Sequence, residues 1–236
     1  MNKTSFRFSH SSNRHVPISD HLESFFSDRK NSEYNRFIVQ TYPAHATIFL
    51  QDTPANSVYL VEHGVVKLVR VAPNGHHVIT GLRRRHWMIG APAVLLEKPY
   101  SFTGITLVPS SLRCIPAKDF LDLAKENKQF SWYLLQMLSR KIFNHMKKVE
   151  AMSCMSAQER LERFLCDMID ELNPVGAEPA SVSLPLKNKE LAQLLAITPE
   201  HLCRVLKEME HKGIISRDNG ILTVTDPESL LQKSLH

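Results

Sequence analysis

The residues best suited to chemistry lie near the carboxyl end, on one face of a short segment with helical periodicity. That face carries the polar side chains of Glu200, His201, Arg204 and Lys207, and apolar side chains occupy the opposite face. An α-helix fits the major groove of DNA, which is ~12 Å wide, and side chains near its N-terminus then reach base edges. This face is therefore expected to contact DNA. The alternative is an ordinary helical hairpin whose charges are only solvated.

Two consecutive helices are expected to position that face. The first runs from about Lys189 to Leu195, and a tight connection follows at Ala196-Ile197. The second opens at Thr198, whose hydroxyl can cap backbone amides, with Pro199 at the first helical position and Gly213 at its end. Helices joined by so short a turn must cross steeply, so the second is left exposed.

The segment behind these helices, residues 214–224, is typical of a β-hairpin. Its turn is expected at Asp218-Asn219-Gly220, because Asn and Gly tolerate the positive φ angles of tight hairpin turns. A hairpin in this place would form the wing of a winged helix-turn-helix domain.

Residues 37–116 show a different pattern of short β-type runs separated by turn residues. Asn74-Gly75, between two such runs, is the strongest hairpin signal in the chain. Short strands at this spacing predict a small antiparallel barrel or jelly roll. Examples of these runs are residues 46–50, 57–61, 65–71, 77–80 and 102–108.

Beyond Pro116 the period becomes helical, with a short helix over residues 118–127 and a longer one from Gln129. Apolar residues and one histidine recur along the longer helix at spacings of 3, 4, 3, 4 and 3, which is the pattern of two helices packed side by side. Trp132, Phe143 and Met146 form a second apolar face, which is expected to pack on the barrel. The first face then suits a partner chain, and a homodimer is expected. Its seam consists of Leu135, Leu138, Ile142, His145, Val149 and Met152.

Composition limits the class of protein. The 236 residues are 43% hydrophobic and 22% charged, as in globular proteins, and no run approaches the ~18 uncharged apolar residues that span a bilayer. The first twenty residues have no apolar core typical of a secretory signal, so a cytoplasmic protein without membrane contact is expected. The net charge of +5 divides unevenly, because residues 1–152 carry 20 Lys and Arg against 11 Asp and Glu, and residues 153–236 carry 9 against 13. A DNA-binding carboxyl end must therefore sort its charges locally.

The order of barrel, long helix and winged helix-turn-helix resembles the Crp/Fnr superfamily of bacterial transcription regulators. The resemblance covers roughly residues 37–230 and is most specific at 184–192 and 195–206, with barrel motifs at 42–46, 57–68 and 73–75. It implies an α+β fold with an N-terminal antiparallel β-roll like a cyclic-nucleotide-binding domain. The expected divisions are a flexible arm at 1–33, the β-roll at 34–128, a dimerisation helix at 129–154 and the DNA-binding domain at 155–236.

In that family a Glu and an Arg four residues later reach base edges, and the matching residues are Glu200 and Arg204. An Arg can donate two hydrogen bonds to guanine, and a Glu can accept one from cytosine. Lys187, Lys189 and Lys207 are expected at phosphates. The resemblance also implies an inverted-repeat operator in double-stranded DNA and contact with RNA polymerase. The full set of candidate DNA contacts is Lys187, Asn188, Lys189, Thr198, Pro199, Glu200, His201, Arg204 and Lys207.

The sensor site departs from the family pattern. Gly90 and Ser101 match the cyclic-nucleotide cassette, but its Glu is replaced by Ala91 and its phosphate-binding Arg by Tyr100, which argues against cyclic AMP. The first cysteine is Cys114, so the N-terminal ligands of an Fnr-type iron–sulfur cluster are absent. The effector is left unidentified, and its expected pocket consists of Ile89, Gly90, Ala91, Tyr100, Ser101 and His145.

Three other interpretations stay open. Haem could bind a histidine, since a neutral imidazole is a good axial ligand. The regulator could also be constitutive, without a small ligand. A cupin-like metal enzyme is the third, with only His45, Glu62, His63, His76 and His77 as its pool of ligands. The sequence favours a regulator over an enzyme. Separately, Arg83-Arg84-Arg85 could bind an anion or be a solvated cluster.

Overall fold

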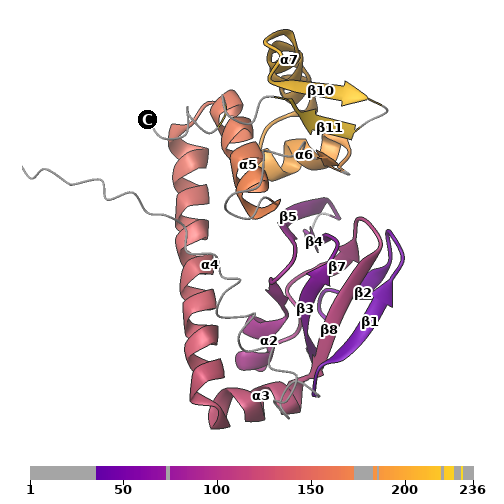
Figure 1. Cartoon of the computed structure of the whole chain (residues 1–236), viewed down its shortest axis with the longest axis vertical. Coiled ribbons are helices and arrows are strands. Elements are labelled where there is room, and N and C mark those ends of the chain that lie inside the picture. The colour runs from indigo at the N-terminus through magenta and orange to yellow at the C-terminus, as the bar shows by residue number, and fades with distance from the viewer. Residues whose placement is uncertain are drawn as a thin grey trace, which may run out of the picture.

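The computed structural model describes residues 36–72, 75–172, 183–184, 186–218, 221–225 and 230. The expected arm at 1–33 lies outside these residues, as do Asn74 and Asn219-Gly220 of the two expected turns. A β-barrel and a smaller helical domain lie one above the other, and one long helix runs alongside both (Figure 1). None of the described helices is both long and apolar enough to cross a membrane.

The barrel consists of two four-stranded antiparallel sheets. The first has the order β1 (Ile38–Tyr42), β8 (Ser110–Pro116), β3 (Ser57–His63) and β6 (Met88–Ile89). The second has the order β2 (Thr47–Phe49), β7 (Thr103–Thr106), β4 (Val66–Val71) and β5 (His77–Arg83). Alternating side chains of both sheets, among them Phe49, Val61 and Leu112, meet in a buried core. The predicted hairpin at Asn74-Gly75 is present as the antiparallel pair β4–β5, in which Val71 faces His77.

Three helices accompany the barrel. Helix α2 (Ala91–Leu95) lies between β6 and β7 in the chain, and α3 (Ala117–Glu126) and α4 (Lys128–Cys154) follow β8. Asn127 begins α4, since its side chain accepts a hydrogen bond from the Phe130 amide at 3.0 Å. The first turns of α4 close the base of the barrel through Phe130, Leu134 and Met137, which pack with Phe120 of α3. With 27 residues, α4 extends ~40 Å and reaches past the barrel to the helical domain (Figure 1).

The face of α4 that packs on the barrel differs from the one expected. Trp132, Phe143 and Met146 are 59–64% exposed, so the prediction that they cover the barrel is wrong. Phe130, Tyr133, Leu134 and Met137 do so instead. The exposed apolar residues include Leu135, Ile142, Met146 and Val149, at spacings of 7, 4 and 3.

Two of the expected seam residues lie off this exposed stripe. Leu138 packs partly against the barrel core, and His145 lies near cations of the barrel side. Hydrophobic spacing in the sequence identified a two-faced helix but could not decide which face the barrel covers, because both repeats have the same period.

The helical domain contains α5 (Ala157–Leu172), β9 (Ser183–Leu184), α6 (Asn188–Leu195), α7 (Pro199–His211), β10 (Ile215–Asp218) and β11 (Ile221–Val224). Its three strands form a sheet of order β10-β11-β9, so the predicted wing is present and gains a short third strand that was not predicted. Its core joins all three helices through Leu161, Leu191, Leu202 and Leu206. This arrangement is a winged helix-turn-helix.

Candidate nucleic-acid interface

Local chemistry fixes where α7 begins. The Thr198 hydroxyl accepts a hydrogen bond from the His201 amide at 3.2 Å, and Pro199 takes the first helical position, as predicted. Leu202, Val205, Leu206 and Met209 are buried in the domain core and hold the inner side of the helix. Spacing of 3 and 4 between these residues forces the polar residues of α7 outward.

The outward face of α7 is open to solvent. Glu200 and Arg204 stand one turn apart, and within the described part of the chain neither side chain has a hydrogen-bond or ion-pair partner. Their donors and acceptors are therefore available to an external ligand. All nine candidate DNA contacts are exposed: Lys187, Asn188, Lys189, Thr198, Pro199, Glu200, His201, Arg204 and Lys207.

Helix α6 supports α7 and is itself fixed at both ends. At its start, the Glu190 carboxylate accepts a hydrogen bond from the Lys187 amide at 3.0 Å. At its end, the Arg160 side chain of α5 donates to the Leu195 carbonyl at 2.8 Å, which satisfies a backbone group left unpaired by the helix. Ala196 takes the left-handed conformation, with φ of 53°, and makes the tight connection to α7.

The wing is tied to α7 by a side-chain ion pair. Arg217 of β10 donates from Nε to Glu210 of α7 at 2.7 Å and from its terminal nitrogen to the second carboxylate oxygen. Arg217 holds the pKa of Glu210 below its usual range, although partial burial opposes this. The pair keeps the wing at a fixed position beside the exposed helix.

The helix-turn-helix is anchored to the barrel through α6, which lies above β5 (Figure 1). Lys67 of β4 donates to Glu190 at 2.6 Å, and both Val69 and Ile79 of the barrel pack in one buried cluster with Leu186 and Leu194. The Gln193 amide donates to the His77 carbonyl at 3.0 Å and accepts from the Ile79 amide at 3.3 Å. Sequence reasoning missed these contacts, because the paired residues lie more than a hundred positions apart and carry no local motif.

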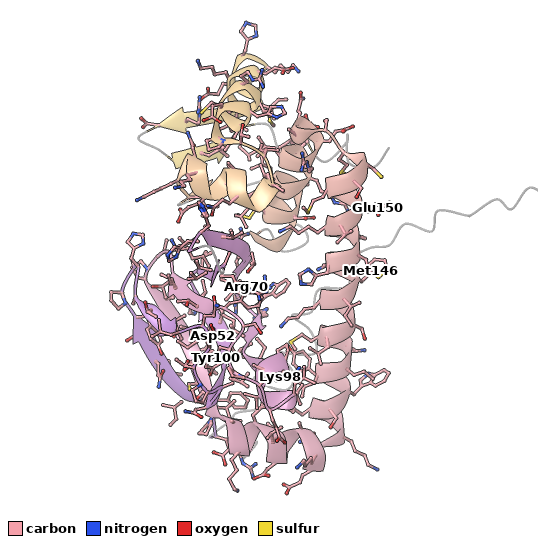
Figure 2. All side chains as sticks on the ribbon, turned by 180° about the vertical axis from the view of Figure 1, so that it is seen from behind. Asp52, Arg70, Lys98, Tyr100, Met146 and Glu150 are labelled. Atoms are coloured by element: carbon pink, nitrogen blue, oxygen red, sulfur yellow. The ribbon has the colours of Figure 1, made fainter. Side chains whose placement is uncertain are left out.

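Tyr100, which stands where the cyclic-nucleotide cassette has its phosphate-binding Arg, is packed into the barrel. Tyr100 is 5% exposed, stacks on Phe49 with ring centroids 4.2 Å apart, and donates from its hydroxyl to the Ser57 carbonyl at 2.5 Å. Gly90, with φ of 87°, packs tightly here, since an added Cβ would lie 3.0 Å from both the Ser57 carbonyl and the Tyr100 ring. Figure 2 shows Tyr100 among the barrel strands.

The six expected pocket residues differ in their exposure to solvent. Ile89, Ala91 and Tyr100 are buried, and Ser101 is exposed. His145 projects from α4, where burial and then the nearby charges of Arg83, Lys148 and Lys141 lower its pKa.

Metal binding by the histidines of the barrel would need further ligands close to them. No group of three His, Cys, Asp or Glu that could hold a metal ion occurs among the residues for which the structure gives positions. Glu62, one of the five candidate ligands of a cupin-like metal enzyme, forms an ion pair with Arg113. His76 and His77 are both exposed at the β4–β5 hairpin.

Comparison with known proteins gives the same two parts in the same order. Residues 39–127 match the cyclic nucleotide-binding domain, and residues 159–233 match the Crp-like helix-turn-helix domain. The global nitrogen regulator of Nostoc sp. (strain PCC 7120) is 26% identical over 195 residues, which are 82% of this chain and 87% of that protein. The anaerobic regulatory protein of Pasteurella multocida (strain Pm70) is 23% identical over 79% of this chain and 68% of its own.

Solved structures share the fold. The structure of FixK2 from Bradyrhizobium japonicum superposes with a TM-score of 0.70 at 20% identity, covering 83% of this chain and 96% of that one. A CRP/FNR-family transcriptional regulator from Thermus thermophilus gives a TM-score of 0.68 at 19% identity, covering 84% and 99%. The two domains match in this order, and the relatives are regulators. The chain therefore belongs to the Crp/Fnr family of transcription regulators and carries a DNA-binding helix-turn-helix domain.

Proposed function

We propose that this regulator acts in the cytoplasm as a homodimer that binds an inverted-repeat operator through α7. The observation that carries this proposal is the exposed pair Glu200 and Arg204 on a helix whose other face is buried. Dimers of this class place two recognition helices ~34 Å apart, one helical turn of DNA, so each half-site receives one α7.

Within each half-site, Arg204 donates two hydrogen bonds to a guanine and Glu200 accepts one from a cytosine. Lys187 and Lys189, at the start of α6, and Lys207 on α7 contact phosphates, which sets the register on the duplex but carries no sequence information. Asn188, Thr198, Pro199 and His201 are exposed at the N-terminal ends of the two helices and complete the surface.

The homodimer is supported by the exposed stripe on α4. Leu135, Ile142, Met146 and Val149 are 56–64% exposed and follow a coiled-coil repeat. Apolar side chains in such a row are rarely left in water by a monomer, and a second copy of α4 would cover them.

Control by an effector at the barrel and α4 is the regulatory part of the proposal, with RNA polymerase as the further partner once DNA is bound. A constitutive regulator is the second candidate, favoured by the side chain of Tyr100, which is packed into the barrel where the cassette has its phosphate-binding Arg. The relatives are regulators, and we propose no enzymatic activity.

The decisive experiment is selection of bound duplexes from a random pool by the native full-length protein. We expect a G·C-containing inverted repeat with half-site centres one helical turn apart. Recovery of sequences without two-fold symmetry, or no enrichment at all, contradicts the proposal. Absorption and mass spectra of the same preparation identify any retained ligand, and a Soret band would assign haem instead.

A further inference from the structure

The exposed stripe of α4 belongs to a longer row with an unbroken heptad repeat. The members of this row follow one another at alternating spacings of 3 and 4, and all of them are exposed. Phe130, Met137 and Ala151, on the opposite side of the helix, are buried. Heptad positions a and d therefore face away from the rest of the chain, and position f lies on the buried side. The exposed row consists of Trp132, Leu135, Ser139, Ile142, Met146, Val149 and Ser153.

The positions that flank the exposed row, e and g, carry one acid and one base. Between residues 131 and 152, the ionisable side chains at these positions are Glu150 at e and His145 at g. Glu150 follows Met146 of the exposed row by one turn (Figure 2). It is also the one carboxylate in the sequence of α4, so it is the one acid that a second copy of α4 could offer.

Within one chain, His145 and Glu150 do not meet, because residues five apart lie about 140° apart around a helix. Neither side chain has a hydrogen-bond or ion-pair partner among the residues that the structure places. Burial and then the charges of Arg83, Lys148 and Lys141 lower the pKa of His145, and no carboxylate of the described residues is among the groups that shift it. A single chain thus disfavours the charged form of this imidazole.

A second copy of α4 placed along the exposed row would supply the missing carboxylate. The two helices run parallel, because the proposed binding to one duplex needs both copies of α7 at the same end of the dimer. In a parallel pair, a g position of one helix faces the e position five residues further on in the other. All three pairs of this kind are chemically matched, which supports the register. They are Ser131 with Gln136, Leu138 with Phe143, and His145 with Glu150.

We propose that in the dimer the His145 imidazole of each copy donates to the Glu150 carboxylate of the other, and that proton uptake by His145 strengthens the dimer. The inference rests on the proposed homodimer and adds to it a specific pair of side chains and a dependence on pH. Two-fold symmetry forms the pair twice. Because the dimer favours the charged imidazole more than a single chain does, association must tighten as the pH falls through the pKa of His145 in the dimer.

The test is the dimer dissociation constant of the full-length protein, measured by sedimentation at about pH 8 and about pH 6. An exposed ion pair contributes about threefold, so two pairs should lower the dissociation constant about tenfold at the lower pH. His145→Gln and Glu150→Gln should each reduce this change to less than about twofold, and the double variant should behave like either single variant. The same pH dependence in the wild type and all three variants overturns the proposal.

A matched control tests the location of the acid. Glu126→Gln makes the same chemical change at an exposed carboxylate of α3, outside the exposed row and its flanking positions, and should leave the tenfold change with pH intact. A loss as large as that in Glu150→Gln overturns the assigned contact.

A second measurement does not depend on dissociating the dimer. NMR titration of histidine-labelled protein follows the imidazole of His145, whose signal is identified by its loss in His145→Gln. Glu150→Gln should lower the pKa of His145 in the dimer by about half a unit, which corresponds to threefold per pair, and an unchanged pKa overturns the proposal. A protein that is monomeric at every pH contradicts the proposed homodimer as well, whereas a dimer without this pH dependence contradicts only the present inference.

Discussion

Lys67 of the barrel donates to Glu190 of the helix-turn-helix at 2.6 Å, across 123 positions of sequence. Both side chains are largely buried, with 16% and 18% of their surface exposed. The same Glu190 carboxylate accepts from the Lys187 amide, so one side chain both caps α6 and fastens it to the barrel. Since α6 packs directly on α7, this ion pair helps to set where the exposed face of α7 lies relative to the barrel.

Removing the charge of Lys67 should destabilise the folded chain. Lys67→Met keeps the aliphatic stem but removes the charge, so Glu190 loses its partner in a half-buried place, and the free energy of unfolding should fall by about 1–2 kcal/mol. Chemical denaturation measures it. The control is Lys118→Met, which removes the exposed pair with Asp122 and should change the stability far less, because solvent screens an exposed ion pair. Equal effects of the two variants would show that burial of the Lys67–Glu190 pair adds nothing to the free energy of unfolding.

The contribution of the Lys67–Glu190 pair to the free energy of unfolding should depend on pH in the acid range. Burial opposes ionisation of Glu190, but hydrogen bonds from Lys67 and the Lys187 amide outweigh it and lower its pKa below the ordinary 4.5. Its contribution to stability is therefore complete above pH 4.5 and disappears as the pH falls through the lowered pKa. The stability difference between wild type and Lys67→Met, followed from about pH 6 to about pH 3, should shrink toward zero. A difference that stays constant would contradict the role of the ionised carboxylate.

Arg204 should contribute to sequence preference, whereas Lys187 should contribute to affinity for DNA of any sequence. Arg204→Ala removes the proposed base contact, for which about 1–3 kcal/mol of discrimination is expected, so preference for the selected operator should be lost while the oligomeric state is unchanged. Lys187→Ala should weaken all sequences alike and reduce the slope of log affinity against log salt by about 1 per half-site. Anisotropy titrations on operator and scrambled duplexes measure both. Unchanged operator preference in Arg204→Ala would refute the assigned contact.

Local sequence signals predicted the start and end of α7 and the main β-hairpins. The Thr198-Pro199 start of α7, its end at Gly213 and the antiparallel pairs β4–β5 and β10–β11 all follow from capping and turn chemistry among neighbouring residues. The short pieces β6, α2 and β9 were missed, since two to five residues are too few to show a period.

Contacts between distant residues could not be predicted in the same way. Nothing near Lys67 or Gln193 indicates that each meets the other domain, and Arg83 gave no sign of which helix it would approach. On α4, the face of Trp132, Phe143 and Met146 was expected on the barrel but is exposed, and four of the five apolar residues of the expected seam are exposed as well. Which face the barrel covers depends on where α3 turns the chain, and this is a property of packing rather than of the repeat.

The exposed stripe of α4 should be needed for dimerisation. Met146→Glu places a charge in the middle of the stripe, and burying an unpaired carboxylate there should convert the dimer to a monomer at micromolar concentration. Arg140→Glu makes a larger change of charge on another face of the same helix and should leave the dimer intact. Sedimentation velocity distinguishes the two. A dimeric Met146→Glu protein would mean that the copies associate through a different surface.

Lys141 should make the free energy of unfolding depend on pH a second time. Here the charged form is disfavoured in the folded chain, whereas the charged form of Glu190 is favoured. Its pKa in the folded chain is about 7, against an ordinary value of 10.5, because burial and the nearby Arg83 disfavour the charged form. Below pH 7 the amine is charged in both the folded and the unfolded chain, so the full penalty of burying the charge is present. Between pH 7 and 10.5 the unfolded chain binds more protons, so the free energy of unfolding should rise with pH across this range.

Lys141→Met removes the titrating amine and keeps most of its packing on Trp87, so the variant should be more stable than wild type at about pH 7 and should lose this rise toward about pH 10. Denaturant titrations at several pH values, in buffers without multivalent anions, measure the difference between the two proteins. A wild-type rise that persists unchanged in Lys141→Met would assign the penalty to another group.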